Sequence, residues 1–197
     1  DSLDADARRV SFTVARVATA ESVERVRDLI SDAQRYGRTY RQVRPALRDA
    51  VDSAPLSGPQ LEAIFRTYVG RAQASGALDS LNNPMVRDEF PYRMWSATHD
   101  ARTEQSHKDM EHSGLDGTAI YRADDPIWTW AIAPVRWNCR CNSTIPISIE
   151  DAARYGVREA QKWMETGIPP VVPTFVKSIP LKPVKGWTPT GARLLAV

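Results

Sequence analysis

Hydrophobic residues recur at helical spacing through the first 83 positions of the chain. The clearest stripe follows Ser57-Gly58-Pro59, with apolar residues three and four positions apart: Leu61, Ile64, Phe65, Tyr68, Val69 and Ala72. Proline suits the first turn of this helix, and Gly76 suits its end. Three further segments show amphipathic spacing: 4–18, 20–36 and 41–51. We therefore predict a helical region over residues 1–83.

The pattern changes after Asn82-Asn83-Pro84. Three short runs then have the composition of β-strands: 92–98, 118–121 and 139–145. A short helix over 106–112, ended by Gly114 and Gly117, is predicted between the first two. These elements predict a small mixed α/β core over residues 84–147.

A further helical segment is predicted over residues 148–167. Ser148 followed by Asp151 is typical of a helix start, and Gly167 of a helix end. Residues 168–197 then hold six of the fourteen prolines, four basic residues and no acidic residue. This composition predicts an extended basic Pro-rich tail, which either packs on its own domain or binds DNA or an acidic protein surface. The fold class is α+β.

Charge and composition exclude some classes of protein function. The chain has 26 basic and 24 acidic residues, so no overall field attracts nucleic acid. The basic residues before position 80 are all arginine, which indicates solvated ion pairs or a docking surface for a partner protein. No apolar run approaches the roughly 20 residues of a membrane span, and residues 1–4 lack a signal pattern. We expect no membrane association and, with two cysteines, a reducing compartment.

Four segments in the middle of the chain form one ordered motif. They are His99–His107 (HDARTEQSH), Leu115–Gly117 (LDG), Tyr121–Trp128 (YRADDPIW) and Pro134–Cys141 (PVRWNCRC). In this order and spacing they resemble the C-terminal domain of phage Mu F-type minor head proteins, including the closing N-C-R-C. The resemblance covers about Leu61 to Pro146, with the N-terminal helices and the tail outside it.

The resemblance implies a minor structural protein in the interior of a bacteriophage head, found in the host cytoplasm during assembly. The implied partners are the portal protein and major capsid or scaffold proteins, with packaged DNA as a further partner of the tail. Association with head assembly and DNA delivery is implied, and enzymatic activity is not. The residues assigned to the structural motif are Asp100, Arg102, Thr103, Ser106, His107, Asp116, Gly117, Asp124, Asp125, Trp128, Asn138 and Arg140.

Cys139 and Cys141 leave two interpretations open. Two thiolates, His107 and either His99 or Asp100 would supply four ligands for a structural zinc ion, the candidate cofactor. Alternatively, the reduced thiols pack as small hydrophobic groups. A disulfide is disfavoured because so small a ring is strained. A zinc-dependent hydrolase or effector using His107 and both cysteines is the alternative function.

The polar residues around Asp100 also have two interpretations. In the structural one, Thr103 or Ser106 caps a helix and Arg102 pairs with Asp100 or Asp116. In the catalytic one, His107 is a general base oriented by Asp100, with Ser106 or a cysteine as nucleophile. We favour the structural interpretation, because no oxyanion site or phosphate loop accompanies the cluster.

Two predictions concern neighbouring aromatic and histidine residues. His112 lies five positions after His107, off that face of a helix, and should be solvated. Trp128, Trp130 and Trp137 should pack in the core, because too few basic residues are interleaved with them to form a platform that stacks nucleic-acid bases.

Overall fold

The computed structural model of the chain describes residues 20–51, 56–129 and 131–170. The chain divides into two compact units, with the boundary between Gln73 and Ala74. Helices and a small antiparallel sheet together confirm the α+β class. The predicted helix over 4–18 and nearly all of the Pro-rich tail lie outside the described residues.

The first unit is helical, as predicted. It contains α2 (Ala20–Arg35), α3 (Tyr40–Ala50) and most of α4 (Gly58–Leu81). A capping box starts α3, with the backbone N–H of Thr39 donating to the side chain of Gln42 at 2.7 Å. The three helices bury one apolar cluster between them: Val26, Ile30, Ala33, Val43, Leu47, Ala50, Val51, Leu61, Ile64 and Phe65.

The predicted end of α4 at Gly76 is wrong, because the helix continues to Leu81. A glycine inside a helix costs up to about 1 kcal/mol relative to alanine. Ala74 and Leu78 on either side of it are only 7% and 1% exposed and belong to the core of the second unit. Their burial offsets the weak helix propensity of Gly76.

The second unit is built on a three-stranded antiparallel sheet, in which β1 (Tyr92–Ser96) lies between β2 (Ile120–Arg122) and β3 (Asn142–Ile147). The first two strands confirm their predictions. The third begins at Asn142 and not at residue 139, so the prediction that both cysteines lie on a strand is wrong. A short helix before the sheet, α5 (Pro84–Glu89), was missed, although Asn83 caps it in the usual way.

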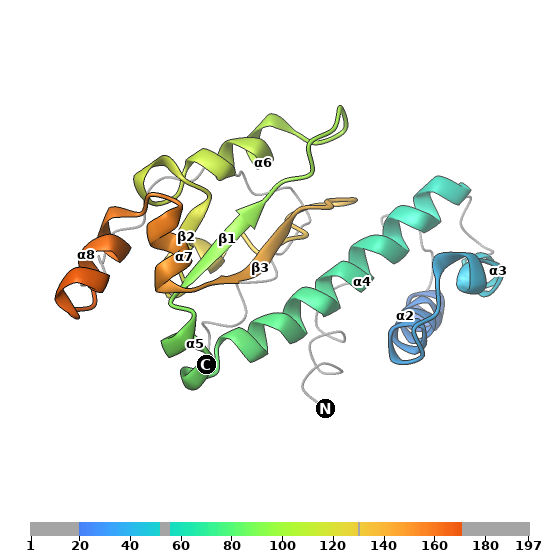
Figure 1. Cartoon of the computed structure of the whole chain (residues 1–197). Coiled ribbons are helices and arrows are strands. Elements are labelled where there is room, and N and C mark those ends of the chain that lie inside the picture. The colour runs from blue at the N-terminus through green and yellow to red at the C-terminus, as the bar shows by residue number, and fades with distance from the viewer. Residues whose placement is uncertain (1–19, 52–55, 130, 171–197) are drawn as a thin grey trace. The chain divides into compact units, whose positions relative to one another are not determined.

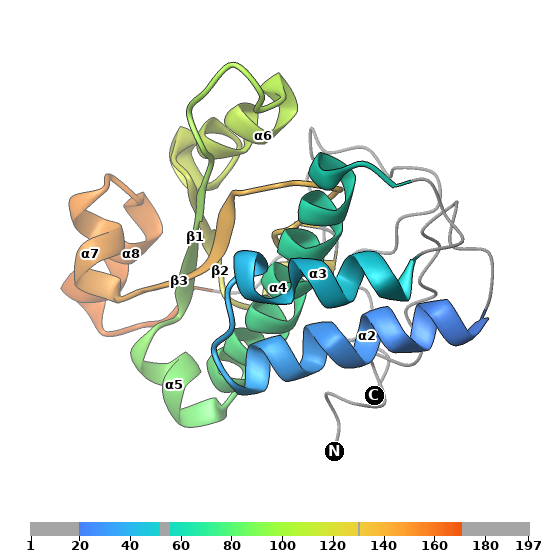
Figure 2. The ribbon, with the colours of Figure 1, turned by 90° about the vertical axis from the view of Figure 1, so that its right-hand side faces the viewer.

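One face of this sheet is covered by α7 (Ile149–Arg154) and α8 (Arg158–Thr166), which lie side by side in Figures 1 and 2. The single helix predicted here is broken at Gly156, whose φ is 91°. The predicted helix start at Ser148 and end at Gly167 are confirmed. The cluster buried on this face is Tyr92, Ile120, Ile147, Ala152, Val157 and Ala160.

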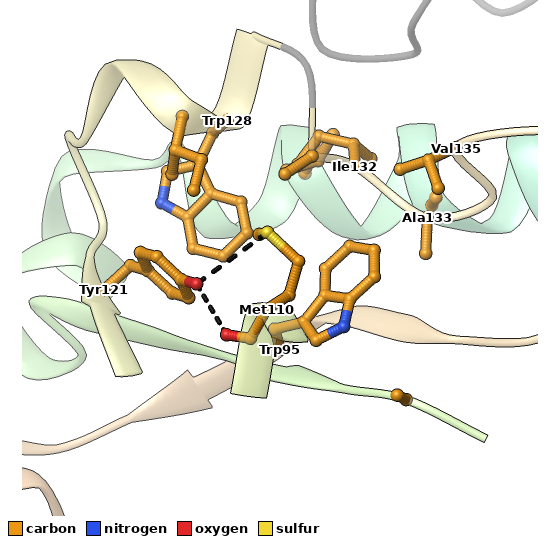
Figure 3. Close-up of a cluster of buried hydrophobic side chains, with 12 residues drawn as sticks. Trp95, Met110, Tyr121, Trp128, Ile132, Ala133 and Val135 are labelled. Carbon is orange, nitrogen blue, oxygen red and sulfur yellow. Dashed lines mark hydrogen bonds between the residues drawn. The ribbon is translucent and has the colours of Figure 1, made fainter. Parts of the chain in front are cut away.

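The other face of the sheet carries a more aromatic cluster. It includes Trp95 and Tyr121, and Figure 3 shows the Tyr121 hydroxyl directed at Met110, to whose carbonyl it donates at 2.6 Å. Met110 follows α6 (Gln105–Asp109) and begins the 3-10 helix η1 (Met110–His112), in the region of the predicted helix 106–112. Two further 3-10 turns, η2 (Leu115–Gly117) and η3 (Pro126–Thr129), flank β2.

The remaining loops contribute to the same cluster, including residues 131–135, which are all buried. Ser143 of β3 accepts a hydrogen bond from the backbone N–H of Ala133 at 2.7 Å, so this loop is tied to the sheet. Within the described ranges, none of the helices has both the length and the apolar character that a membrane crossing needs.

Candidate functional site

His107 is the fixed centre of the site. It lies on α6 and is only 4% exposed. The indole Nε1 of Trp95 donates to the His107 carbonyl at 2.8 Å, and the two rings meet edge to face with centroids 6.2 Å apart. Because Trp95 is itself fully buried in β1, the imidazole is held against a rigid wall.

The two cysteines reach His107 from a turn that precedes β3. The backbone N–H of Cys139 donates to the carbonyl of Arg136 at 3.2 Å, which closes the turn. Asn138 within it has a φ of 58°, a left-handed conformation that asparagine tolerates better than most residues. A turn, and not the extended strand predicted, therefore carries the C-x-C segment and presents both thiols to the imidazole.

Three potential donor atoms converge at this point. Nδ1 of His107 lies 3.4 Å from Sγ of Cys141 and 3.7 Å from Sγ of Cys139. The nitrogen and the two sulfurs all lie within 4.8 Å of one another. Both cysteines are free thiols, half-buried, and pack against the aromatic cluster of the sheet. The arrangement fits both sequence interpretations, small apolar groups and metal ligands.

The two thiols differ in acidity because they share a hydrogen bond. The pKa of Cys139 is lowered, first by the hydrogen bond from Cys141 and then by that from His107, against an opposing effect of burial. The pKa of Cys141 is raised, because its proton is held in the bond to Cys139 and because it is buried. Cys139 is therefore the thiol that ionises first.

Asp100 organises the polar residues beside the thiols. Its carboxylate accepts hydrogen bonds from the Arg102 backbone at 2.9 Å and the Thr103 hydroxyl at 3.1 Å, and pairs with Arg140 at 2.6 Å. The Arg140 hydrogen bond is the largest cause that lowers the pKa of Asp100 to about 2. Since Thr98 also donates to the Arg140 carbonyl at 2.9 Å, this network ties the C-x-C turn to the end of β1.

Parts of the predicted network are wrong in detail. The cap residue of α6 is Glu104, which makes no side-chain capping bond, so neither Thr103 nor Ser106 caps that helix. The predicted pairing of Arg102 with Asp100 is confirmed at 3.7 Å, although the Arg102 side chain is mostly exposed. Asp116 pairs with Arg158, at the start of α8, and not with Arg102.

His99 pairs with a carboxylate and does not face the predicted metal site. Its Nε2 lies 2.7 Å from the carboxylate of Glu111, whose other oxygen accepts from the backbone N–H of Ala97 at 2.8 Å. The His99 side chain is 64% exposed, and it is outside the group of three donor atoms. His112 is exposed, as predicted.

The other residues of the motif shape the loops around the sheet. Asp125 accepts from the backbone N–H of Ile127 at 2.8 Å, and burial raises the pKa of this carboxyl. Trp128 donates to the carbonyl of Arg122 at 2.7 Å. Asp124 is exposed, and Gly117 has a φ of 80°, which favours glycine. The positions of these residues fit a structural role.

An open pocket of about 120 Å³ lies beside the thiols. Its lining residues are Arg102, Thr103, Glu104, His107, Arg136, Trp137, Asn138, Cys139, Arg140 and Cys141. Trp137 on its wall is 37% exposed, so the prediction that this residue is part of the core is wrong. Trp128 is buried as predicted, and Trp130 lies outside the described residues.

A family model described as Phage Mu protein F like protein matches residues 24–144. The chain belongs to this family. The match begins within α2, so the expectation that the N-terminal helices lie outside the family region is wrong. No solved structure gives a significant match.

A curated relative supports the same assignment. The chain is 32% identical over 164 residues to the Mu-like prophage FluMu F protein of Haemophilus influenzae. The alignment covers 75% of this chain and 36% of that relative. The resemblance inferred from the D-x-R-T-x-x-S-H and N-C-R-C segments is therefore confirmed, while the chain spans little more than a third of the relative's length.

Sequence reasoning missed several residues that support the site. Trp95 could have been found, because it occupies an inward position of an alternating strand. Glu111 and Ser143 could not, because each acts on a residue ten or more positions away with no local pattern. Glu104 and Arg136 likewise form an ion pair across the pocket that only the folded chain brings together.

Proposed function

We propose that this chain is a minor structural protein of a bacteriophage head, without enzymatic activity, that associates with the portal during head assembly. The single observation that carries the proposal is the family match over residues 24–144, which includes both the helical unit and the thiol-containing unit. The relative from a Mu-like prophage supports the phage origin.

The chemistry of the motif supports a structural role. The Asp100 carboxylate is engaged by Arg140, Thr103 and the Arg102 backbone, and is therefore not free to orient a general base. His99 is paired with Glu111. Groups bound to one another in this way stabilise loops, which supports a structural role.

Co-expression tests this role. The chain is produced together with the portal and major capsid or scaffold proteins encoded beside it, and purified particles are analysed by quantitative mass spectrometry. Retention below the copy number of the capsid protein, dependent on the portal, is expected for a minor head protein inside the virion. Particles of normal composition that exclude the chain would refute the proposal.

Residues 168–197 are the proposed contact for packaged DNA, and their deletion should lower DNA affinity and its salt dependence.

A zinc-dependent hydrolase or effector is the second candidate function. The observation that favours it is the pocket beside His107 and the two thiols, lined by Arg102, Arg136 and Arg140, which could hold an anionic substrate. Stoichiometric zinc together with turnover that is lost in His107→Ala would support this candidate. Zinc without turnover of phosphoester or peptide substrates would favour the structural role.

A further inference from the structure

The distances at the thiol site match the spacing of zinc ligands. Zinc binds thiolate sulfur at about 2.3 Å and imidazole nitrogen at about 2.0–2.1 Å, so a tetrahedral angle separates the two donors by about 3.6 Å. The observed separations from Nδ1 of His107 are 3.4 Å to Cys141 and 3.7 Å to Cys139, on either side of this value. The three donors already stand where one ion could reach all of them.

Hydrogen bonding alone explains the short distances from His107 to both sulfurs less well than a shared metal ion does. Nδ1 of an imidazole either donates one proton or accepts one, and a thiol is a weak partner in both roles. Here one nitrogen approaches two sulfurs at once in a half-buried position. A cation between the three atoms satisfies them together.

The backbone around the sulfurs supports thiolates. Val135 and Cys141 make backbone hydrogen bonds to the Cys139 sulfur, and Thr98 makes one to the Cys141 sulfur. Such bonds to the ligand atoms are the usual support for a bound metal, because they orient the ligands and stabilise their charge. The contact with Trp95 likewise holds the His107 ligand in a fixed orientation.

We propose that Nδ1 of His107 and the sulfurs of Cys139 and Cys141 bind one Zn²⁺ ion, with the fourth coordination position open to the adjacent pocket and filled by solvent. His99 is excluded as fourth ligand by its pairing with Glu111, and Asp100 by its bonds to Arg140 and Thr103. Across the described ranges, no further histidine, cysteine or carboxylate joins this group of donors. Two cysteines and one histidine are a ligand set that elsewhere leaves a fourth position for water or substrate. This site goes beyond the proposed role in the phage head and does not depend on it.

The zinc content of the purified protein is the first test. The full chain of 197 residues is purified under reducing conditions without chelator, and its metal content is measured by mass spectrometry. Equimolar zinc is expected in the unaltered chain and in the control His112→Ala, which changes an exposed histidine. The zinc content should fall at least tenfold in Cys139→Ser, Cys141→Ser and His107→Ala, with folding checked by circular dichroism.

Cobalt substitution keeps the test decisive if a variant does not fold, since it uses the unaltered protein. Co²⁺ should give thiolate charge-transfer absorption and the strong visible bands of four-coordinate cobalt, and azide should shift these bands through the open position. An unaltered chain that has reduced thiols but binds neither zinc nor cobalt would overturn the proposal, as would isolation of a Cys139–Cys141 disulfide without metal. Bands that azide leaves unchanged would overturn the open fourth position.

Discussion

The two faces of the three-stranded sheet are built differently, although every strand contributes to both. The face under α7 and α8 is covered by regular helices, and its cluster consists of small and aliphatic residues around Tyr92. The opposite face is covered by the end of α4, by α6 and by loops and 3-10 turns, and its cluster includes two tryptophans, with both thiols at its margin. Regular helices satisfy their own backbone and need only apolar contacts, whereas loops need side-chain partners.

Those side-chain partners come from the sequence motif, as Asp100 does, and from outside it, as Glu111 and Ser143 do. Asp100, Glu111 and Ser143 each accept hydrogen bonds from loop backbone on the thiol side of the sheet. On the helical side, polar bonds lie at the margin, as between Arg122 and Glu159. The comparison therefore indicates that the chemistry is concentrated where the backbone is irregular, and five substitutions test it.

The largest expected effect is that of Trp95→Ala on the thiol side. Removing a fully buried indole that also bonds to His107 should lower the free energy of unfolding by about 3–5 kcal/mol, through lost transfer energy and a cavity. Denaturant unfolding measures the loss. Trp137→Ala is the control, because its side chain is 37% exposed, and it should change stability by less than about 1 kcal/mol. Similar losses in both variants would contradict the assigned core.

Val157→Ala tests the helical side. Val157 is fully buried under α8, and the loss of two methyl groups should cost roughly 2 kcal/mol of unfolding free energy. Metal uptake and the reactivity of the two thiols should stay unchanged, because the sheet separates this cluster from His107. Tyr155→Ala, at an exposed position, is the matched control. Altered thiol reactivity in Val157→Ala would show that the faces are not independent.

Glu159→Gln tests the ion pair at the margin of the helical side. Arg122 Nε donates to Glu159 at 2.7 Å, and the two side chains are 13% and 20% exposed. Loss of the carboxylate charge should cost about 1.5 kcal/mol, measured by denaturant unfolding. The exposed pair Arg154–Asp151 is the control, and Arg154→Gln should cost less than about 0.5 kcal/mol. Equal costs would mean that the partly buried position of Glu159 adds nothing to the stability that the ion pair provides.

Asp100→Asn should have the smallest effect, and that effect should depend on pH. The folded-state pKa of Asp100 is lowered to about 2 from an ordinary value of 3.8. The stabilisation is therefore fully present above the ordinary value and is lost as pH falls toward about 2. The difference in Tm between the unaltered chain and Asp100→Asn should be positive at neutral pH and should shrink across this interval.

Arg140→Gln identifies the partner responsible for that pH dependence. In an Arg140→Gln background, the Tm difference caused by Asp100→Asn should be much smaller at neutral pH, because the main cause of the lowered pKa is gone. A difference of the same size in both backgrounds would assign the effect to the Thr103 and backbone bonds instead.

Much of the fold could be predicted from local pattern. The apolar spacing in α2, α3 and α4 and the composition of β1 are local signals, and each element was found. The errors arose where a distant contact overrides local preference. Burial of Ala74 and Leu78 carries α4 past Gly76. The bond from Thr98 to the Arg140 carbonyl holds the C-x-C segment after the turn that Cys139 closes, and β3 begins only at Asn142.

The sequence predicted most residues of the candidate site, but not the residues with which the neighbouring side chains pair. His107, Cys139 and Cys141 were chosen, with His99 or Asp100 as a fourth ligand, from residue type and order, and the structure brings the donor atoms of the first three together without that of His99. His99 was assigned to the metal and Asp116 was one of two partners proposed for Arg102, whereas their actual partners are Glu111 and Arg158. Salt bridges of exposed residues leave little trace in sequence, because many pairings are sterically allowed.

The sequence by itself determined the family, the fold class, the helical first unit and the three candidate metal ligands. These follow from residue type, order and local spacing, which are properties of the chain alone. The tertiary structure decided that the thiols meet His107 from a turn, that His99 turns to Glu111, and that the two faces of the sheet differ in chemistry. These outcomes depend on contacts across 12 to 34 residues, and only the packed chain selects among them.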